Sequence, residues 1–297
     1  MVKVDLAGHI EQRYGVVVAS SASLDDGTVK LELADGRRWV ARIFAAERPL
    51  ATTEAEAALL TRLEQAGFPA ERCADQRPVS SCDGRPVLVT EFIDGPQARS
   101  FAWLGALLGG LHARPGAGLP AGGGWHHVAV GTPTDEITAV TELLDEAVAN
   151  VRARELALLD RLRAAAERAD DCHDLPHCLV HPDFVPANAI QGERSPVIID
   201  WAGAGRGPRL WSLGFLLWAA ASQARLQAVI SRYTRRVNLE PEELDRLEGA
   251  IWGRPAMLDC WSFATGRTPL ARAAERVEQA QLDAGRIAAN ARRLFAG

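Results

Sequence analysis

Four polar residues are close enough in the sequence to share one site: His181, Asp183, Asn188 and Asp200. The first three stand in the segment His-Pro-Asp-Phe-Val-Pro-Ala-Asn, and Asp200 directly follows the apolar run Val197–Ile199. A loop carboxylate such as Asp183 can accept the proton of an attacking hydroxyl. Mg²⁺ prefers oxygen ligands, which the Asp200 carboxylate and the Asn188 amide would supply. A lone Asp or Asn in a loop is usually a turn former, but this spacing favours chemistry.

Strands and one helix must position these residues. Short strands are predicted before and after the loop, at Cys178–Val180 and Val197–Ile199. In the first 95 residues, β-branched or alternating apolar runs predict further strands at Tyr14–Ser20, Thr28–Leu33, Arg38–Phe44 and Arg85–Phe92. A capping box of Thr53 and Glu56 predicts a helix over Thr53–Ala66. Beyond this region the pattern is helical, with two amphipathic helices expected in Pro133–Ala169.

The pattern His-x-Asp-x4-Asn, followed by an apolar strand and Ile-Asp-Trp, resembles the aminoglycoside phosphotransferase family, which shares its fold with protein kinases. The resemblance covers most of the chain from Tyr14 to Trp218. It implies an α+β, bilobal protein-kinase-like fold, with a small β-rich nucleotide-binding lobe (1–95) and a larger helical lobe (96–297). It also implies ATP or GTP as phosphate donor and Mg²⁺ as cofactor. In that reading Asp183 is the proton acceptor, His181 braces the loop, and Asn188 and Asp200 bind the metal.

The resemblance also implies a nucleotide site in the first lobe. Val-Ala-Arg-Ile at 40–43 resembles the kinase strand whose cation binds the α- and β-phosphates, with Arg42 as that cation. Its partner would be Glu56, which shares a helix face with three leucines. Backbone groups of Glu91 and Ile93 would bind the adenine edge. Two plainer interpretations stay open: Glu56 completes only the capping box, and Arg42 is an exposed strand arginine.

Four features depart from the family pattern. Pro182 stands where a glycine is expected, Val185 replaces a common second histidine, and Ser212 replaces a frequent aspartate. The segment 20–23, where a phosphate-covering loop is expected, holds three serines and no glycine. None of these changes removes the proton acceptor or the metal ligands, but they weaken the case for an aminoglycoside as acceptor.

Composition excludes several classes of protein. The chain has 297 residues, a net charge of −5 and 47% hydrophobic residues, which is typical of a folded protein of two lobes. No basic block suggests nucleic acid, no apolar run is long enough for a membrane span, and no export signal is expected. Five scattered cysteines indicate reduced thiols in a cytoplasmic protein.

These features together predict an enzyme that transfers the γ-phosphate of ATP or GTP to a hydroxyl of a small molecule. An antibiotic or similar natural product is the favoured acceptor, and the enzyme would then confer resistance. Two alternatives remain: a metabolic kinase for choline, an amino-sugar or a sugar adduct, and a catalytically weak nucleotide-binding regulator. Both a monomer and a homodimer stay open. Two or three of the tryptophans in the helical part could line the acceptor site: Trp103, Trp125, Trp201, Trp211, Trp218, Trp252 and Trp261.

Overall fold

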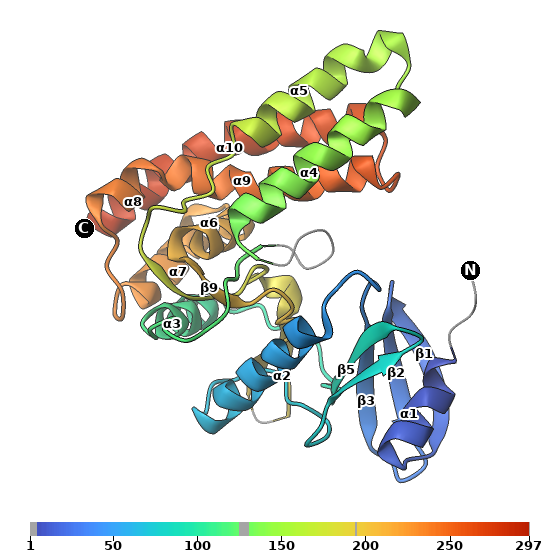
Figure 1. Cartoon of the computed structure of the whole chain (residues 1–297). Helices are drawn as coiled ribbons and strands as arrows, with labels where there is room; N and C mark the ends of the chain where they lie inside the picture. The colour runs from blue at the N-terminus through green and yellow to red at the C-terminus, as the bar shows by residue number, and fades with distance from the viewer. Residues whose placement is uncertain (1–4, 125–130, 194, 297) are drawn as a thin grey trace. The chain divides into compact units, whose positions relative to one another are not determined.

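The computed structural model describes residues 5–124, 131–193 and 195–296, which form two compact units (Figure 1). The N-terminal unit comprises Met1–Ala98 and Ala187–Ala202, and the helical unit comprises Arg99–Pro186 and Gly203–Gly297. The first is rich in strands and the second in helices, so the α+β class is confirmed. The division differs from the expected split after residue 95, because the segment Ala187–Ala202 folds with the N-terminal unit.

The N-terminal unit is built on a five-stranded antiparallel sheet in the order β1-β2-β3-β5-β4. Its strands are β1 (Val18–Asp25), β2 (Thr28–Leu33), β3 (Arg38–Ile43), β4 (Val79–Cys82) and β5 (Arg85–Glu91). The prediction of a strand from Tyr14 is wrong at its start, because helix α1 (Leu6–Tyr14) occupies this segment. Asp5 caps the first turn of α1, and Gly15 ends the helix in the left-handed conformation at φ 64°.

Alternation along β3 sends its side chains to two faces of the sheet. Trp39 and Ala41 pack into an apolar core with Ile10 of α1. Arg42 therefore points to the opposite face, where its cross-strand neighbour is Leu88 of β5. Because the Arg42 side chain is only 14% exposed, the interpretation of this residue as an exposed strand arginine is wrong.

Helix α2 (Leu50–Gln65) packs against β4 and β5. It begins at Leu50, earlier than the predicted Thr53, and its N-cap residue Pro49 makes no side-chain cap hydrogen bond. Thr53 and Glu56 therefore lie inside the helix and form no capping box, contrary to the plainer interpretation. Both are buried, which leaves the Glu56 carboxylate on the inner face of α2.

A small hairpin of β7 (Ala189–Gln191) and β8 (Pro196–Ile198) completes the N-terminal unit. Just before β7, Asn188 accepts a hydrogen bond at its C=O from the N–H of Ile199, at 2.9 Å. The connecting turn lies at the far end of the two strands. Asn188 and Asp200 therefore lie at the same open end of the hairpin.

The helical unit surrounds one short strand pair, β6 (His177–Val180) with β9 (Gly205–Pro208). Its helices are α3 (Phe101–His112), α4 (Pro133–Ala147), α5 (Leu156–Glu167), α6 (Arg209–Ala220), α7 (Gln223–Tyr233), α8 (Pro241–Asp245), α9 (Leu247–Ala264) and α10 (Leu270–Ala296). The two predicted helices in Pro133–Ala169 are confirmed as α4 and α5. Helices α4, α5, α9 and α10 run alongside one another, as Figure 1 shows.

Helices α3 and α7 approach closely at Gly105. A Cβ atom on Gly105 would lie 2.3 Å from the backbone oxygen of Val229 in α7. Side chains do not tolerate such a distance, so a methyl group here has to push two helix backbones apart.

We expect Gly105→Ala to lower the free energy of unfolding by about 2 kcal/mol, within the usual cost of overpacking. Gly110→Ala is the matched control on the same helix, where nothing lies within 4 Å of the added Cβ. It should raise stability by up to about 1 kcal/mol, because alanine has the higher helix propensity. Urea denaturation followed by circular dichroism compares the two variants, and equal stabilities would contradict the close approach.

Candidate active site

The loop after β6 is held by His181, whose side chain is fully buried. The N–H of Asp183 donates to His181 Nδ1 at 3.0 Å, and the His181 C=O accepts from Ser212 Oγ at 2.9 Å. The His181 ring also packs edge-to-face with the ring of Phe184, with the ring centroids 5.8 Å apart. Ser212, which replaces the frequent family aspartate, thus fixes the backbone at the histidine.

The Asp183 carboxylate is bound by an arginine from a distant helix. Arg254 of α9 donates to Asp183 Oδ1 from Nε at 3.0 Å and from Nη2 at 2.5 Å. The Nη1 of Arg254 donates to Glu136 of α4. The Arg254 and Glu136 side chains are fully buried, whereas Asp183 is 19% exposed. Asp183 is thus the solvent-facing end of a buried chain of three charges.

A second cluster of charges lies in the N-terminal unit, on the α2 side of the sheet. Arg42 Nη1 lies 3.2 Å from Asp200 Oδ1 and 3.8 Å from Glu56 Oε1. The closer partner of Glu56 is Arg48, whose Nη2 donates to Glu56 Oε2 at 2.6 Å. The Arg48 guanidinium also lies over the ring of Phe44, 4.0 Å from its centroid. The sequence therefore predicted the Arg42–Glu56 pair but missed the arginine that binds Glu56 directly.

Glu71 positions the backbone at Asp200. Its carboxylate, in a residue only 4% exposed, accepts from the N–H of Asp200 at 2.7 Å and of Trp201 at 3.3 Å through Oε1. Its Oε2 accepts from Thr90 Oγ1 at 3.1 Å. Asp200 has φ 66°, a left-handed conformation that costs a non-glycine residue about 1 kcal/mol or more. The two hydrogen bonds to Glu71 stabilise this unfavourable conformation.

Burial and charge act in opposite directions on these groups. Burial lowers the pKa of Arg42, but the carboxylates of Asp200, Glu71 and Glu56 outweigh it, so the net pKa is raised. Burial raises the pKa of Glu56, and the guanidinium groups of Arg48 and Arg42 oppose that change. Arg42 consequently keeps its positive charge at any physiological pH.

The cluster fits a magnesium nucleotide. Within the described residues, Arg42 Nη1, Glu56 Oε1 and Asp200 Oδ1 are buried and make ion pairs but no hydrogen bond. A buried polar atom without a hydrogen bond costs about 1–3 kcal/mol, so further ligand atoms would stabilise these groups. Phosphate oxygens suit the Arg42 fork, and Mg²⁺ suits the carboxylate of Asp200 with the amide oxygen of Asn188 from the same hairpin end.

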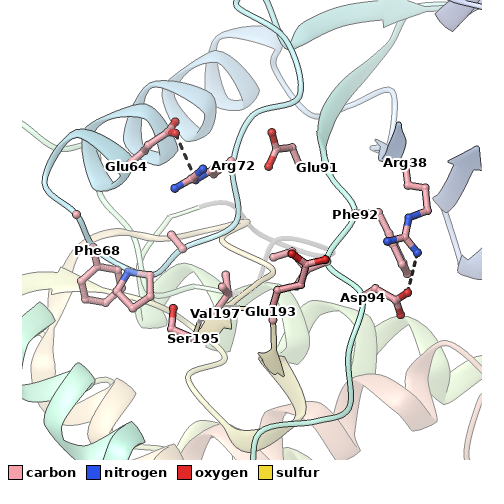
Figure 2. Close-up of a pocket in the computed structure, with 15 residues that line it drawn as sticks. Arg38, Glu64, Phe68, Arg72, Glu91, Phe92, Asp94, Glu193, Ser195 and Val197 are labelled. Atoms are coloured by element: carbon pink, nitrogen blue, oxygen red, sulfur yellow. Dashed lines mark hydrogen bonds and ion pairs between the residues drawn. The ribbon is translucent and has the colours of Figure 1, made fainter. Parts of the chain in front are cut away.

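Residues 91–94 line one side of a pocket of about 560 Å³ in the N-terminal unit (Figure 2). Apolar side chains of Phe68 and Val197 lie across from this segment, and the Arg38–Asp94 ion pair lies beside it. The Phe92 N–H donates to the backbone C=O of Arg38 in β3, at 2.9 Å. Because backbone groups alternate along an extended chain, those of Glu91 and Ile93 point away from β3, and the Glu91 N–H donates to the C=O of Arg72 at 2.9 Å. The lining therefore combines backbone groups of residues 91–94 with both apolar and charged side chains.

Residues 17–249 match the sequence model of the phosphotransferase enzyme family. The chain belongs to this family. No curated protein matches the chain. Among the residues that the structure describes, no helix is long and apolar enough to cross a membrane.

This phosphotransferase is similar in fold to several solved kinases. Amicoumacin kinase hAmiN, solved with AMP-PNP and Ca²⁺, has 14% identity and a TM-score of 0.69, with 93% of each chain covered. Choline kinase LicA from Streptococcus pneumoniae has 14% identity and a TM-score of 0.64, covering 93% of this chain and 97% of the other. Macrolide 2′-phosphotransferase MphH from Brachybacterium faecium has 20% identity and a TM-score of 0.56, covering 91% and 96%. The protein-kinase-like fold expected from the sequence is thereby confirmed.

Sequence reasoning missed four charged residues of the phosphotransferase: Arg48, Glu71, Glu136 and Arg254. For Arg254 a signal existed, because it is the one charged residue in the apolar run Ala250–Met257 of α9. Glu71 has no local signal, since its partners at Asp200 and Trp201 are far away in the sequence.

We expect Glu71→Ala to weaken binding of magnesium nucleotide about tenfold, because the N–H groups of Asp200 and Trp201 lose a charged acceptor. Glu71→Gln keeps one amide oxygen for these donors and should lose less. Isothermal titration calorimetry measures the affinities. Hydrogen–deuterium exchange of the peptide 198–202 should accelerate in the alanine variant only, and unchanged exchange there would show that Glu71 does not hold this segment.

We expect Arg42→Lys to raise the nucleotide KM several-fold, because a lysine cannot reach Asp200 and a phosphate together as the arginine fork does. Arg42→Ala should raise it more and also lower kcat. The unit should still fold, since Arg48 retains its bond to Glu56. Steady-state kinetics test both variants against Arg37→Ala, an exposed turn arginine whose loss should leave the KM unchanged. An unchanged KM in Arg42→Ala would refute the nucleotide site.

Proposed function

We propose that this phosphotransferase transfers the γ-phosphate of ATP or GTP to a hydroxyl of a small molecule, with Mg²⁺ as cofactor. The observation that carries the proposal is the buried cluster of Arg42 and Asp200. Both stand in segments that resemble motifs of the family, and both have a buried atom that makes ion pairs but no hydrogen bond within the described residues. A pocket of the same unit would supply a place for the base.

The nucleotide would be bound by side chains and backbone of the N-terminal unit. The C=O of Glu91 and the backbone of Ile93 would pair with the edge of the base, and Phe68 and Val197 would contact its faces. Arg42 would bind α- and β-phosphate oxygens, with Glu56 holding the position of its guanidinium. Asp200 and Asn188 would hold Mg²⁺, which neutralises phosphate charge when bound.

Asp183 would act on the acceptor. As the hydroxyl oxygen forms its bond to the γ-phosphorus, the bond from that phosphorus to the nucleoside diphosphate breaks, and Asp183 accepts the hydroxyl proton. His181 keeps the loop in place through its bond to the Asp183 N–H. The products are the phosphate ester and the nucleoside diphosphate.

An antibiotic or similar natural product is the proposed acceptor, and phosphorylation would then confer resistance. Amicoumacin kinase and a macrolide phosphotransferase are among the similar folds, and so is choline kinase LicA. Trp201 and Trp211 are buried in the core and do not line an acceptor site, whereas Trp218 is 37% exposed. Trp125 lies outside the described residues. The five free cysteines support the cytoplasm as the location, and the enzyme would work as a monomer or homodimer.

The test is a coupled assay of nucleoside diphosphate release with ATP or GTP and Mg²⁺. The acceptor panel contains macrolides, peptide-like antibiotics, aminoglycosides, choline, ethanolamine and amino-sugars, with mass spectrometry of the product. Turnover with an antibiotic supports the proposal, and turnover with choline or an amino-sugar alone would make this a metabolic kinase. Nucleotide binding without turnover on any acceptor would indicate a regulatory protein.

We expect Asp183→Ala to lower kcat by about 10²–10⁴-fold, the usual contribution of a proton acceptor, with nucleotide affinity nearly unchanged. Asp200→Asn should instead raise the Mg²⁺ concentration needed for half-maximal rate, because the substitution removes the negatively charged carboxylate that is proposed to bind the metal. A rate above one tenth of wild type in Asp183→Ala, or equal Mg²⁺ dependence in Asp200→Asn, would contradict the corresponding role.

A further inference from the structure

Arg254 lies where the sequence of α9 is otherwise apolar, and it is fully buried. Burying a guanidinium requires charged partners on more than one side. Arg254 has two charged partners on different elements, which are Asp183 in the loop after β6 and Glu136 on α4. The next residue, Pro255, lies inside the helix and has no N–H for a helical hydrogen bond.

The geometry of the contact restricts the Asp183 carboxylate. Two N–H groups of one planar guanidinium converge on a single oxygen, Oδ1. Two donors from one rigid group fix the position of Oδ1 more closely than the single point charge of a lysine would. The Glu136 carboxylate accepts a hydrogen bond from Nη1 of the same guanidinium and thereby holds the guanidinium in place. Contacts among α4, α9 and the loop after β6 therefore determine the position of the partly exposed Asp183 carboxylate.

We propose that Arg254, held by Glu136, positions the Asp183 carboxylate to receive the proton of the acceptor hydroxyl. The inference rests on the proposed function, in which Asp183 is the proton acceptor. Arg254 does not itself touch the acceptor, because its side chain has no exposed surface. It is a positioning residue, and it affects the reaction through the carboxylate. A general base must lie within hydrogen-bond reach of the proton, so displacement of the Asp183 carboxylate lowers kcat.

The test uses two variants and a matched control. Arg254→Lys keeps the charge but removes the fork. Arg254→Gln with Glu136→Gln removes both buried charges together, so that no uncompensated carboxylate prevents folding. The control is Arg209→Lys, because Arg209 makes a two-pronged contact with buried Glu243 in the same unit but does not contact Asp183.

We expect kcat to fall at least tenfold in Arg254→Lys and in the double variant, with the nucleotide KM within twofold of wild type. The control should keep its kcat even where its melting temperature falls. In the Arg254 variants, hydrogen–deuterium exchange should accelerate in the peptide 181–186 while α10 retains its protection. A wild-type kcat and wild-type exchange in the double variant would overturn the proposal.

The exchange measurement separates this inference from the proposed function. If wild type turns over no acceptor, the proposed function fails, and the peptide 181–186 still shows whether Arg254 holds the loop. If wild type is active and Asp183→Ala is equally active, Asp183 is not the proton acceptor. The positioning role is then refuted whatever the exchange shows.

Discussion

In each unit a buried ion lies between two groups of opposite charge, because a lone ion removed from water costs too much free energy to retain. In the N-terminal unit the buried ion is Glu56, between Arg42 and Arg48. In the helical unit it is Arg254, between Glu136 and Asp183. Each chain of charges leads to a partly exposed carboxylate, Asp200 in one unit and Asp183 in the other. The two carboxylates proposed to act on the substrates are held by partners that are mostly or fully buried.

The local part of this arrangement could be predicted from the sequence. The spacing of His181, Asp183, Asn188 and Asp200 indicated the family and a strand–loop–strand segment, and the structure has strands on both sides. Period-two alternation over β3 was enough to predict its length nearly to the residue. These signals are local, because side chains on a strand alternate faces and a loop must leave one strand and enter the next.

The rest depends on contacts between distant segments. Arg254 binds Asp183 from a helix 71 positions away, and Glu71 binds the Asp200 N–H across 129 positions. Nothing in the local pattern around Glu71 distinguishes it from a surface carboxylate. The start of α2 was also missed, because Thr53 and Glu56 match a capping box that the helix does not use. Burial and tertiary pairing determined these outcomes, and neither is encoded by nearby residues.

The grouping of the segment Ala187–Ala202 with the N-terminal unit has a consequence for synthesis of the chain. A ribosome releases residues in order, so the unit that begins first is completed only after the whole segment 99–186 has emerged. Until then Glu71 lacks its N–H donors from Asp200 and Trp201, and Ala70 lacks its bridge to Ile198. The nascent unit must therefore stay soluble while incomplete. A gene divided after residue 98 would yield two fragments, of which the first lacks the hairpin that finishes its fold.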